Sequence, residues 1–476
     1  MFKKTLLLTF GLFLSLVSFA GDGYHIKIKL NGFEQDSIFF GYQYGDKQYV
    51  RDTIQKNKDG WFHIEGDEAL QGGVYMIVIP PDNKYFELLI DENNQNFTVE
   101  TSYDDLVTKM KIKGSKDNIL FYDYLNFLSS KRPEAEALQK QITEAGEDEN
   151  AKKPLQEKLD KLNESVQEMQ QKIVKEHPLS LPAAIIKATF AIDYPAFEGD
   201  EKEVQMQKWL YTKEHYFDNI NLSDDRLART NLLFQRIDYY INKLEVQHPD
   251  SLNKAIDFIL EKMDPKGENF KFYVVHFLNT YAKSKIVGMD AVYVHIVDKY
   301  YKTDMAYWTP DSTMQKIVEN ADALEPILIG KTAPDIQMQK KDGTKVKLSE
   351  VESPFTVIYV WDPDCGHCKK AAPIVVDFYE KFKDKGVTIF SICGKFTDEV
   401  PSCWDTIEEK GFDNFMNVVD PYHRSKYKVL YNIKSTPQIF ILDKDKKIIM
   451  KRIGAEQLSE VMDQIILQEQ REMEGK

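Results

Sequence analysis

Two cysteines separated by two residues are the feature of this sequence that most clearly predicts chemistry. Cys365 and Cys368 follow the apolar run 356–361, and a helix is expected to begin at the pair. Two thiols on the first turn of a helix can close a disulfide. The thiol at the helix N-terminus lies at the positive end of the helix dipole, where its thiolate is stabilised. We therefore predict thiol–disulfide exchange, with Cys365 as the attacking thiol and Cys368 as its partner.

A zinc site and a peroxidatic cysteine are the two other interpretations of this motif. A structural zinc site usually has two ligand pairs, and Cys393 and Cys403 lack the spacing of a second pair. A strand, a CxxC motif and a helix in that order are the context of redox chemistry, so neither a metal nor a cofactor is expected. Peroxidases of this broad fold carry a threonine three residues before the cysteine. Asp362 occupies that position here, so the peroxidatic interpretation fails.

Thr436 and Pro437 are the second feature of interest, directly before the apolar run 438–442. A proline at the start of a strand usually has a trans peptide bond and ends strand pairing. Downstream of a CxxC motif it is also a candidate for a cis bond. Such a bond would present the backbone of Thr436 to a substrate strand beside the thiols.

The part of the chain that must position these residues alternates between strands and helices from Gly330 onward. Buried strands that alternate with helices predict an α/β layer structure. We expect a hairpin at 336–348, further strands at 356–361, 387–393, 415–419, 438–442 and 448–452, and helices from the CxxC motif, at 403–410, at 422–430 and near the C-terminus.

Residues 24–112 have the pattern of short strands. Ile26, Ile28 and Leu30 alternate with polar residues, which is typical of a half-buried strand. Further apolar runs follow, separated by turn residues rich in glycine, proline and aspartate. This pattern predicts an antiparallel β-sandwich-like domain, in which we find no catalytic cluster.

From residue 115 to about 326 the hydrophobic period is that of helices, which predicts a central all-α region. An apolar seam recurs there at steps of three and four residues. One interpretation of the seam is a dimer-forming coiled coil, and the other is a helical hairpin that folds back across the polar turn 146–150. The hairpin is favoured because the seam spans few heptads. Its members are Leu155, Leu159, Leu162, Val166, Met169 and Ile173.

The N-terminus and the charge indicate the compartment. Lys3 and Lys4 precede the apolar run 6–19, which closes on a small residue at Ala20. This order predicts a signal peptide, cleaved after about Ala20, and an exported chain without a membrane span. The net charge of −14 argues against nucleic acid as a partner. Periplasm or cell envelope is the predicted location.

The order of the C-terminal motifs resembles that of TlpA/ResA-like thiol–disulfide oxidoreductases. These motifs are the segment 330–335 (GKTAPD), the Asp342-Gly343 hairpin, the strand that ends at Trp361, Cys365-Gly366-His367-Cys368 and Thr436-Pro437. The resemblance implies the thioredoxin fold, a cis Pro437 and dithiol exchange on other envelope proteins.

The upstream parts are similar to two domains of unknown function, one β-rich and one helical, that precede such a domain in Gram-negative envelope proteins. The segment 215–229 is the most recognisable piece, although its polar residues are also typical of helix caps. The resulting organisation is a signal peptide (1–20), a β-rich domain (21–114), a helical domain (115–326) and a thioredoxin-like domain (327–476).

The sequence departs from the family pattern beside the cysteines. Ala371 stands where related reductases carry a glutamate, Tyr359 replaces the buried acid of thioredoxin, and Asp364 replaces an aromatic residue. The sequence therefore shows no obvious general base for Cys368. His367 and Lys369 add positive potential around the pair. Gly366 and His367 match the dipeptide of disulfide isomerases, which suggests a couple less reducing than thioredoxin.

The predicted function is an exported thiol–disulfide oxidoreductase that reduces envelope proteins and is recycled by a thiol donor, expected in the membrane. The alternatives are an isomerase or oxidase, for which the helical region could hold a homodimer, and a binding or assembly protein with an accessory thioredoxin domain. Cys393 and Cys403 are interpreted as an accessory disulfide, as a relay for the active pair or as two free thiols.

Overall fold

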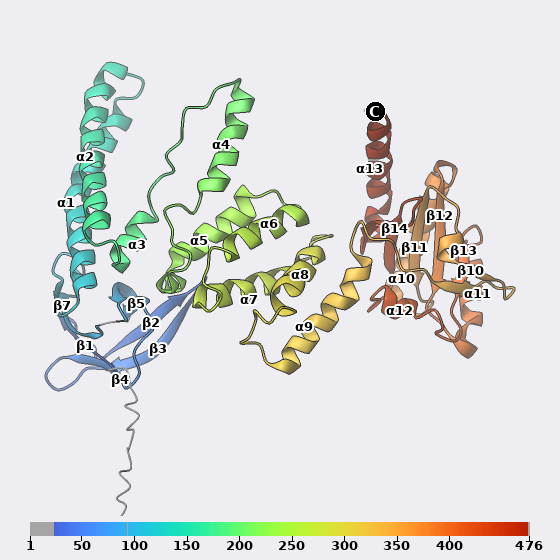
Figure 1. Ribbon diagram of the computed structural model, residues 1–476, viewed down its shortest axis with the longest axis horizontal. Helices are drawn as coiled ribbons and strands as arrows, with labels where there is room; N and C mark the ends of the chain where they lie inside the picture. The colour runs from blue at the N-terminus through green and yellow to red at the C-terminus, as the bar shows by residue number, and fades with distance from the viewer. Residues whose placement is uncertain (1–22, 93, 475–476) are drawn as a thin grey trace, which may run out of the picture. The chain divides into compact units, whose positions relative to one another are not determined.

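The computed structural model describes residues 23–92 and 94–474. It contains two compact units that meet in the sequence between Tyr240 and Ile241 (Figure 1). The predicted signal peptide, residues 1–20, lies outside the described residues. No helix among the described residues is long and apolar enough to cross a membrane. The predicted domain limits near residues 114 and 326 stay predictions.

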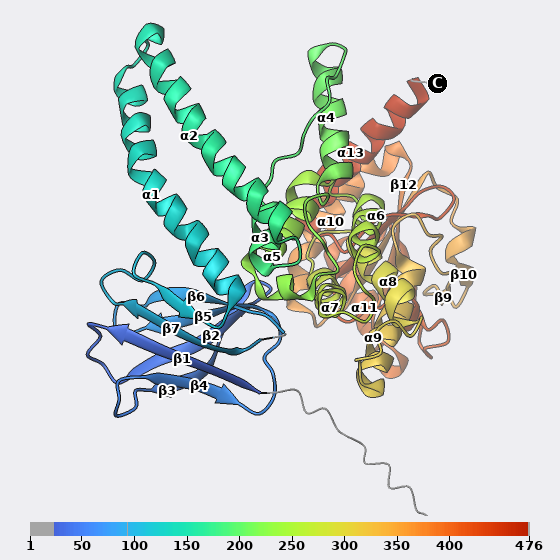
Figure 2. The same cartoon turned by 60° about the vertical axis from the view of Figure 1, so that its left-hand side comes forward.

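The first unit begins with two four-stranded sheets that enclose one apolar core, as the alternating pattern predicted (Figure 2). Their strand orders are β4-β1-β7-β8 and β3-β2-β5-β6. The strands are β1 (Tyr24–Asn31), β2 (Ser37–Tyr44), β3 (Lys47–Gln55), β4 (Phe62–Gly66), β5 (Gly73–Ile79), β6 (Lys84–Ile90), β7 (Asn96–Ser102) and β8 (Lys111–Lys113).

Two details of this sandwich differ from the sequence prediction. β1 and β7 pair in parallel, so the arrangement is not antiparallel throughout. β3 was not predicted, because all of its side chains except Ile54 are exposed and the strand lacks a buried face that could produce alternation.

Helices make up the rest of the first unit. They are α1 (Lys116–Glu144), α2 (Glu149–Glu176), α3 (Leu181–Lys187), α4 (Glu201–His215), the 3₁₀ turn η1 (Asp225–Arg229) and α5 (Asn231–Tyr239). α1 and α2 pack as a hairpin around Gly146, which confirms that interpretation of the seam. In the segment 215–229, Asp224 caps η1 and forms an ion pair with Arg226 at 2.7 Å, as expected of a cap.

The second unit begins with helices and ends with a mixed seven-stranded sheet. The helices that precede the sheet are α6 (Pro249–Leu260), α7 (Glu268–Ala282), α8 (Asp290–Ile296) and α9 (Asp311–Leu324), followed by the short η4 (Glu325–Ile327). The helices that belong to the sheet layer are α10 (Gly366–Phe382), α11 (Pro401–Lys410), α12 (Tyr427–Leu430) and α13 (Ala455–Glu474).

The sheet has the strand order β10-β9-β13-β12-β11-β14-β15. β11 is an inner strand, parallel to β12 and antiparallel to β14, and its side chains are buried on both faces. This is the predicted α/β thioredoxin-like layer. The strands are β9 (Gln337–Gln339), β10 (Lys345–Lys347), β11 (Phe355–Trp361), β12 (Val387–Cys393), β13 (Met416–Val419), β14 (Gln438–Leu442) and β15 (Ile448–Lys451).

The predicted helix at 422–430 is wrong over its first half. His423 and Lys426 have positive φ angles of 54° and 53°, and Asp420 accepts backbone hydrogen bonds from Arg424 and Ser425. An aspartate that binds the N–H groups of the next turn competes with the helix, so α12 begins only at Tyr427.

Candidate active site

Cys365 is the N-cap residue of α10 and follows the carboxyl end of the inner strand β11. Its sulfur accepts a hydrogen bond from the backbone N–H of Cys368 at 3.2 Å. The first turn of a helix carries N–H groups without intrahelical partners, together with the positive end of the dipole. The fold therefore aims that positive potential at the sulfur of Cys365, as predicted from the motif.

The two thiols differ in burial and in pKa. Burial alone would raise the pKa of Cys365, but hydrogen bonds from the Cys368 thiol, from the side chain of Thr436 and from the backbone outweigh it, so this pKa lies below its ordinary value. Burial, followed by the hydrogen bond with Cys365, raises the pKa of Cys368 to about 12. Cys365 is partly exposed, whereas Cys368 is 3% exposed. The geometry therefore suits Cys365 as the nucleophile and Cys368 as the resolving thiol.

The surroundings of Cys368 offer no carboxylate at the two positions where the family carries one. Ala371 is buried in the core, one turn of α10 further on. Tyr359 is fully buried, and its hydroxyl has no hydrogen-bond partner among the described residues. Burial, and then the charges of the two cysteines, raise the pKa of Tyr359. This hydroxyl therefore stays protonated and cannot serve as the base that removes the Cys368 proton.

The loop before β14 meets the first thiol. The Thr436–Pro437 peptide bond is cis, as the resemblance implied. The Cys365 thiol donates a hydrogen bond to the carbonyl oxygen of Thr436 at 3.3 Å. The loop thus brings backbone groups beside the attacking sulfur, where an extended substrate segment could pair with them.

The other predicted residues lie around the pair in different ways. Trp361 is buried and donates its indole N–H to Ser391 at 2.9 Å, so it fixes the end of the strand. Gly366, His367 and Lys369 are exposed at the start of α10. A Cβ atom added at Gly366 would meet no heavy atom within 4 Å, so glycine is not required there for space.

Lys395 is a cation beside the motif that the sequence pattern did not indicate. Lys395 lies 2.6 Å from Asp364, 3.5 Å from Asp362 and 3.8 Å from Glu399, counted between its Nζ and a carboxylate oxygen. It therefore compensates the two acids that oppose a thiolate at Cys365. Trp361 and Cys393 are register partners at the ends of two parallel strands. Lys395 follows Cys393 by two residues, so its position in the sequence could have indicated a cation near Asp362.

Cys393 and Cys403 form a disulfide, with their Cα atoms 6.1 Å apart. The free-thiol interpretation does not hold in this structure. Both cysteines are at most 1% exposed and lie in the same core cluster as Cys368. Because these two sulfurs are bonded to each other, they cannot join Cys365 and Cys368 in a four-cysteine zinc site.

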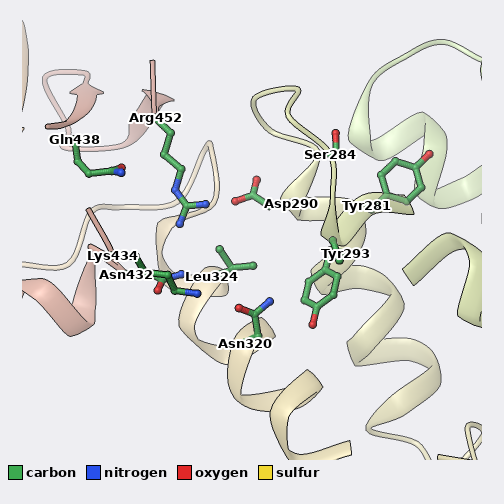
Figure 3. A pocket seen from close by; sticks show the side chains of 11 residues that line it. Tyr281, Ser284, Asp290, Tyr293, Asn320, Leu324, Asn432, Lys434, Gln438 and Arg452 are labelled. Carbon is green, nitrogen blue, oxygen red and sulfur yellow. The ribbon is translucent and has the colours of Figure 1, made fainter. Parts of the chain in front are cut away.

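A polar pocket of about 290 Å³ lies beside Gln438, the residue that follows the cis proline. Asn432, Lys434, Gln438 and Arg452 line it from the sheet side, and Asp290 is among the residues from the preceding helices. Figure 3 shows Arg452 and Asp290 pointing toward one another. The helices before the sheet thus contribute a wall next to the cis-proline loop.

The pKa difference predicts how the reduced protein reacts with pH. In folded protein, alkylation of Cys365 by iodoacetamide should rise with pH and level off below the pH at which it levels off in urea, because its pKa is lowered. Cys368 should stay unreactive until near pH 12. Mass spectrometry after short alkylation pulses measures both. Equal titration of Cys365 in folded and unfolded chains would contradict the assignment.

A CxxC pair at the N-terminus of a helix, an inner strand before it and a cis-proline loop on the first thiol define a thioredoxin-fold thiol–disulfide oxidoreductase. A family model described as the AhpC/TSA family matches residues 329–451. Models of two domains of unknown function match residues 24–121 (DUF4369) and 200–322 (DUF5106).

Curated relatives show which group of thiol–disulfide oxidoreductases this chain resembles. The thiol–disulfide oxidoreductase ResA of Bacillus thuringiensis (strain Al Hakam) is 30% identical over 142 residues, which are 29% of this chain and 77% of that protein. ResA of Bacillus subtilis (strain 168) is 24% identical over 127 residues, 26% of this chain and 67% of the relative. The chain belongs to the ResA-like thiol–disulfide oxidoreductases through its C-terminal part.

The solved structures to which this chain is similar include a domain of a possible thiol-disulfide isomerase from Cytophaga hutchinsonii. It is 32% identical, with a TM-score of 0.29, and covers 32% of this chain and 99% of its own. A thioredoxin-like protein from Bacteroides caccae is 16% identical, with a TM-score of 0.41, and covers 57% of this chain and 98% of its own.

Proposed function

We propose that this protein is an exported disulfide reductase that acts on proteins of the cell envelope. The observation that carries the proposal is the unequal pair of thiols. Cys365 is partly exposed, and its sulfur accepts the backbone N–H of Cys368 and contacts the carbonyl oxygen of Thr436, while Cys368 is buried behind it with a raised pKa. This asymmetry separates the attacking thiol from the resolving thiol.

The reaction proceeds in two exchanges. The Cys365 thiolate attacks one sulfur of a substrate disulfide, the S–S bond breaks, and the released substrate thiolate takes up a proton. The thiol of Cys368 then loses its proton and attacks the Cys365 sulfur of the mixed disulfide, which frees the second substrate thiol. The substrate gains two electrons, and the protein ends with a Cys365–Cys368 disulfide. A thiol donor, proposed to be a membrane protein, must return two electrons.

The sequence pattern of residues 1–20 and the similarity to the family support the proposed compartment and substrates. A disulfide reductase needs disulfides to act on, and these persist in oxidising compartments such as the periplasm. The polar pocket beside Gln438 supports a protein substrate, since its lining offers hydrogen-bonding groups next to the loop that would hold an extended segment.

Disulfide isomerisation is the second candidate, and the Gly366-His367 dipeptide favours it. An exposed imidazole beside the thiolate stabilises the reduced form and makes the couple less reducing. A reduction potential in the range of thioredoxin would support the reductase. A potential in the range of disulfide isomerases, together with dimeric mass in light scattering, would support the isomerase.

The proposal is tested by trapping. In Cys368→Ala, the mixed disulfide at Cys365 has no resolving thiol, so envelope proteins should accumulate on it and be released by a reductant. The matched control is the Cys365→Ser/Cys368→Ala double variant, which should trap nothing. Substrates are identified by mass spectrometry of the non-reduced adducts. If Cys368→Ala yields no more adduct than the double variant when expressed with its signal segment, the proposed function is wrong.

A further inference from the structure

The outer face of one sheet of the β-sandwich brings together three side chains that can bind a metal ion. Along β1, Ile26 and Ile28 point into the core, so His25 and Lys27 point out. β4 runs antiparallel to it, with His25 opposite Glu65 and Lys27 opposite His63. The pairing therefore places two imidazoles and one carboxylate on the same face, at the edge of the sheet formed by β4.

The distances between the donor atoms fit one small ion. Nε2 of His25 lies 3.2 Å from Nδ1 of His63 and 3.6 Å from a carboxylate oxygen of Glu65, and all three donor atoms lie within 4.8 Å of one another. Ligands at zinc–nitrogen distances of about 2.0–2.1 Å in a tetrahedron are separated by roughly 3.3 Å. Both histidines are half-buried and Glu65 is exposed, so the donor atoms are held by the strands yet reachable from solvent.

We propose that His25, His63 and Glu65 form a binding site for Zn²⁺, with water in the fourth position. Two neutral imidazoles and a carboxylate are a donor set that zinc takes in proteins, and three protein ligands leave one position open. Nothing in the redox chemistry of the CxxC motif uses these residues. The site is thus a second functional element, carried by the β-rich part of the chain.

The hydrogen bonds of His63 indicate which of its ring nitrogens carries the proton before zinc binds. Oδ1 of Asn57 accepts the backbone N–H groups of Asp59 and Trp61, so its amide nitrogen faces Nε2 of His63 at 3.3 Å. Nε2 then accepts, and Nδ1–H donates to His25. When Nδ1 binds zinc, the ring proton moves to Nε2, where it needs an acceptor in place of the exposed amide of Asn57.

This conflict predicts a variant that binds more tightly. In Asn57→Asp, one carboxylate oxygen can keep the two backbone N–H groups, and the other can accept Nε2–H of His63. Carboxylates in this outer position raise the basicity of a metal-bound histidine, and their loss typically costs about 10–100-fold in affinity. Lys27, opposite His63, is a cation on this face of β1 and opposes the ion, whereas Glu65 offsets it.

The test is zinc titration of the full chain by calorimetry at pH 7. The protein carries Cys365→Ser and Cys368→Ser, because two thiolates would bind zinc themselves. We expect one zinc per chain, at least tenfold weaker binding in His25→Ala and in His63→Ala, and tighter binding in Asn57→Asp. His177→Ala, an exposed histidine at the end of α2, is the matched control and should change nothing.

Co²⁺ provides a second readout that does not depend on heat. Its visible absorption is intense when four ligands surround it in a tetrahedron and weak for six-coordinate aqueous cobalt. Appearance of the tetrahedral bands, and their loss in His63→Ala with an unchanged circular dichroism spectrum, would support the site. The proposed site would be wrong if the parent protein did not bind zinc. It would also be wrong if His25→Ala and His63→Ala bound zinc as tightly as the parent.

Discussion

Replacing Cys365 with serine is expected to lower the rate of disulfide reduction at least about a thousandfold, to the level of the uncatalysed reaction. A serine hydroxyl is not ionised near neutral pH and has no sulfur to form a mixed disulfide. The fold should not suffer, because serine is a good N-cap residue and its oxygen can accept the N–H of Cys368 that the sulfur now accepts. Turnover of insulin disulfides at pH 7, with a small dithiol as donor, measures the loss.

His367→Ala is the matched control for this experiment. His367 lies two residues away, is exposed and is not needed to form either bond, so turnover should change by only a few fold. Its potential should become more reducing, since the imidazole no longer stabilises the thiolate. If Cys365→Ser kept a tenth or more of wild-type turnover while His367→Ala lost most of its turnover, Cys365 would not be the nucleophile.

The positions of the two thiols could be predicted because they depend on local sequence. An uninterrupted apolar run is typical of a strand buried on both faces, and β11 is such a strand. A CxxC motif that follows it directly must lie where the chain turns into the next helix. Cys365 accordingly caps α10, one residue before the helix begins. Cys393 ends β12, the parallel neighbour of β11, because the apolar run 387–393 is also typical of a buried strand.

Contacts that depend on tertiary structure could not be predicted in this way. Lys395 approaches Asp362 and Asp364 only because β12 lies parallel to β11. The turn before α12 was missed because Asp420 binds backbone groups whose positions the apolar pattern does not specify. His25 and His63 are 38 residues apart, and only the antiparallel register of β1 and β4 brings their rings together.

Replacing Lys451 with methionine is expected to destabilise the second unit by about 3–5 kcal/mol. Lys451 ends β15 and is 1% exposed. Its Nζ lies 2.5 Å from a carboxylate oxygen of Asp290, at the start of α8, and 2.7 Å from the carbonyl oxygen of Ile327. Methionine fills similar space but removes the ammonium group that pairs with this carboxylate, which is 18% exposed. The other oxygen of Asp290 has no hydrogen-bond partner among the described residues, so no bond on that side offsets the loss.

Urea unfolding of the full chain, followed by hydrogen exchange of β15 and α8, measures this effect. Lys444→Met, an exposed lysine on the preceding turn, is the control and should change stability by less than about 0.5 kcal/mol. Adding Asp290→Asn to Lys451→Met should recover part of the loss, because the unpaired charge is removed. A loss below about 1 kcal/mol in Lys451→Met would mean that water reaches the pair in solution.

The Lys451–Asp290 pair also bears on where the redox domain begins. A domain limit near residue 326 would separate Lys451 from Asp290 and from the helices that line the pocket beside Gln438. A fragment that starts at residue 327 would therefore expose the ammonium group of Lys451 and lose that wall. We expect the fragment to keep its thiol chemistry, since Cys365, Cys368 and Thr436 all lie within it. It should be less stable than the second unit of the full chain, because the ion pair of Lys451 with Asp290 is lost.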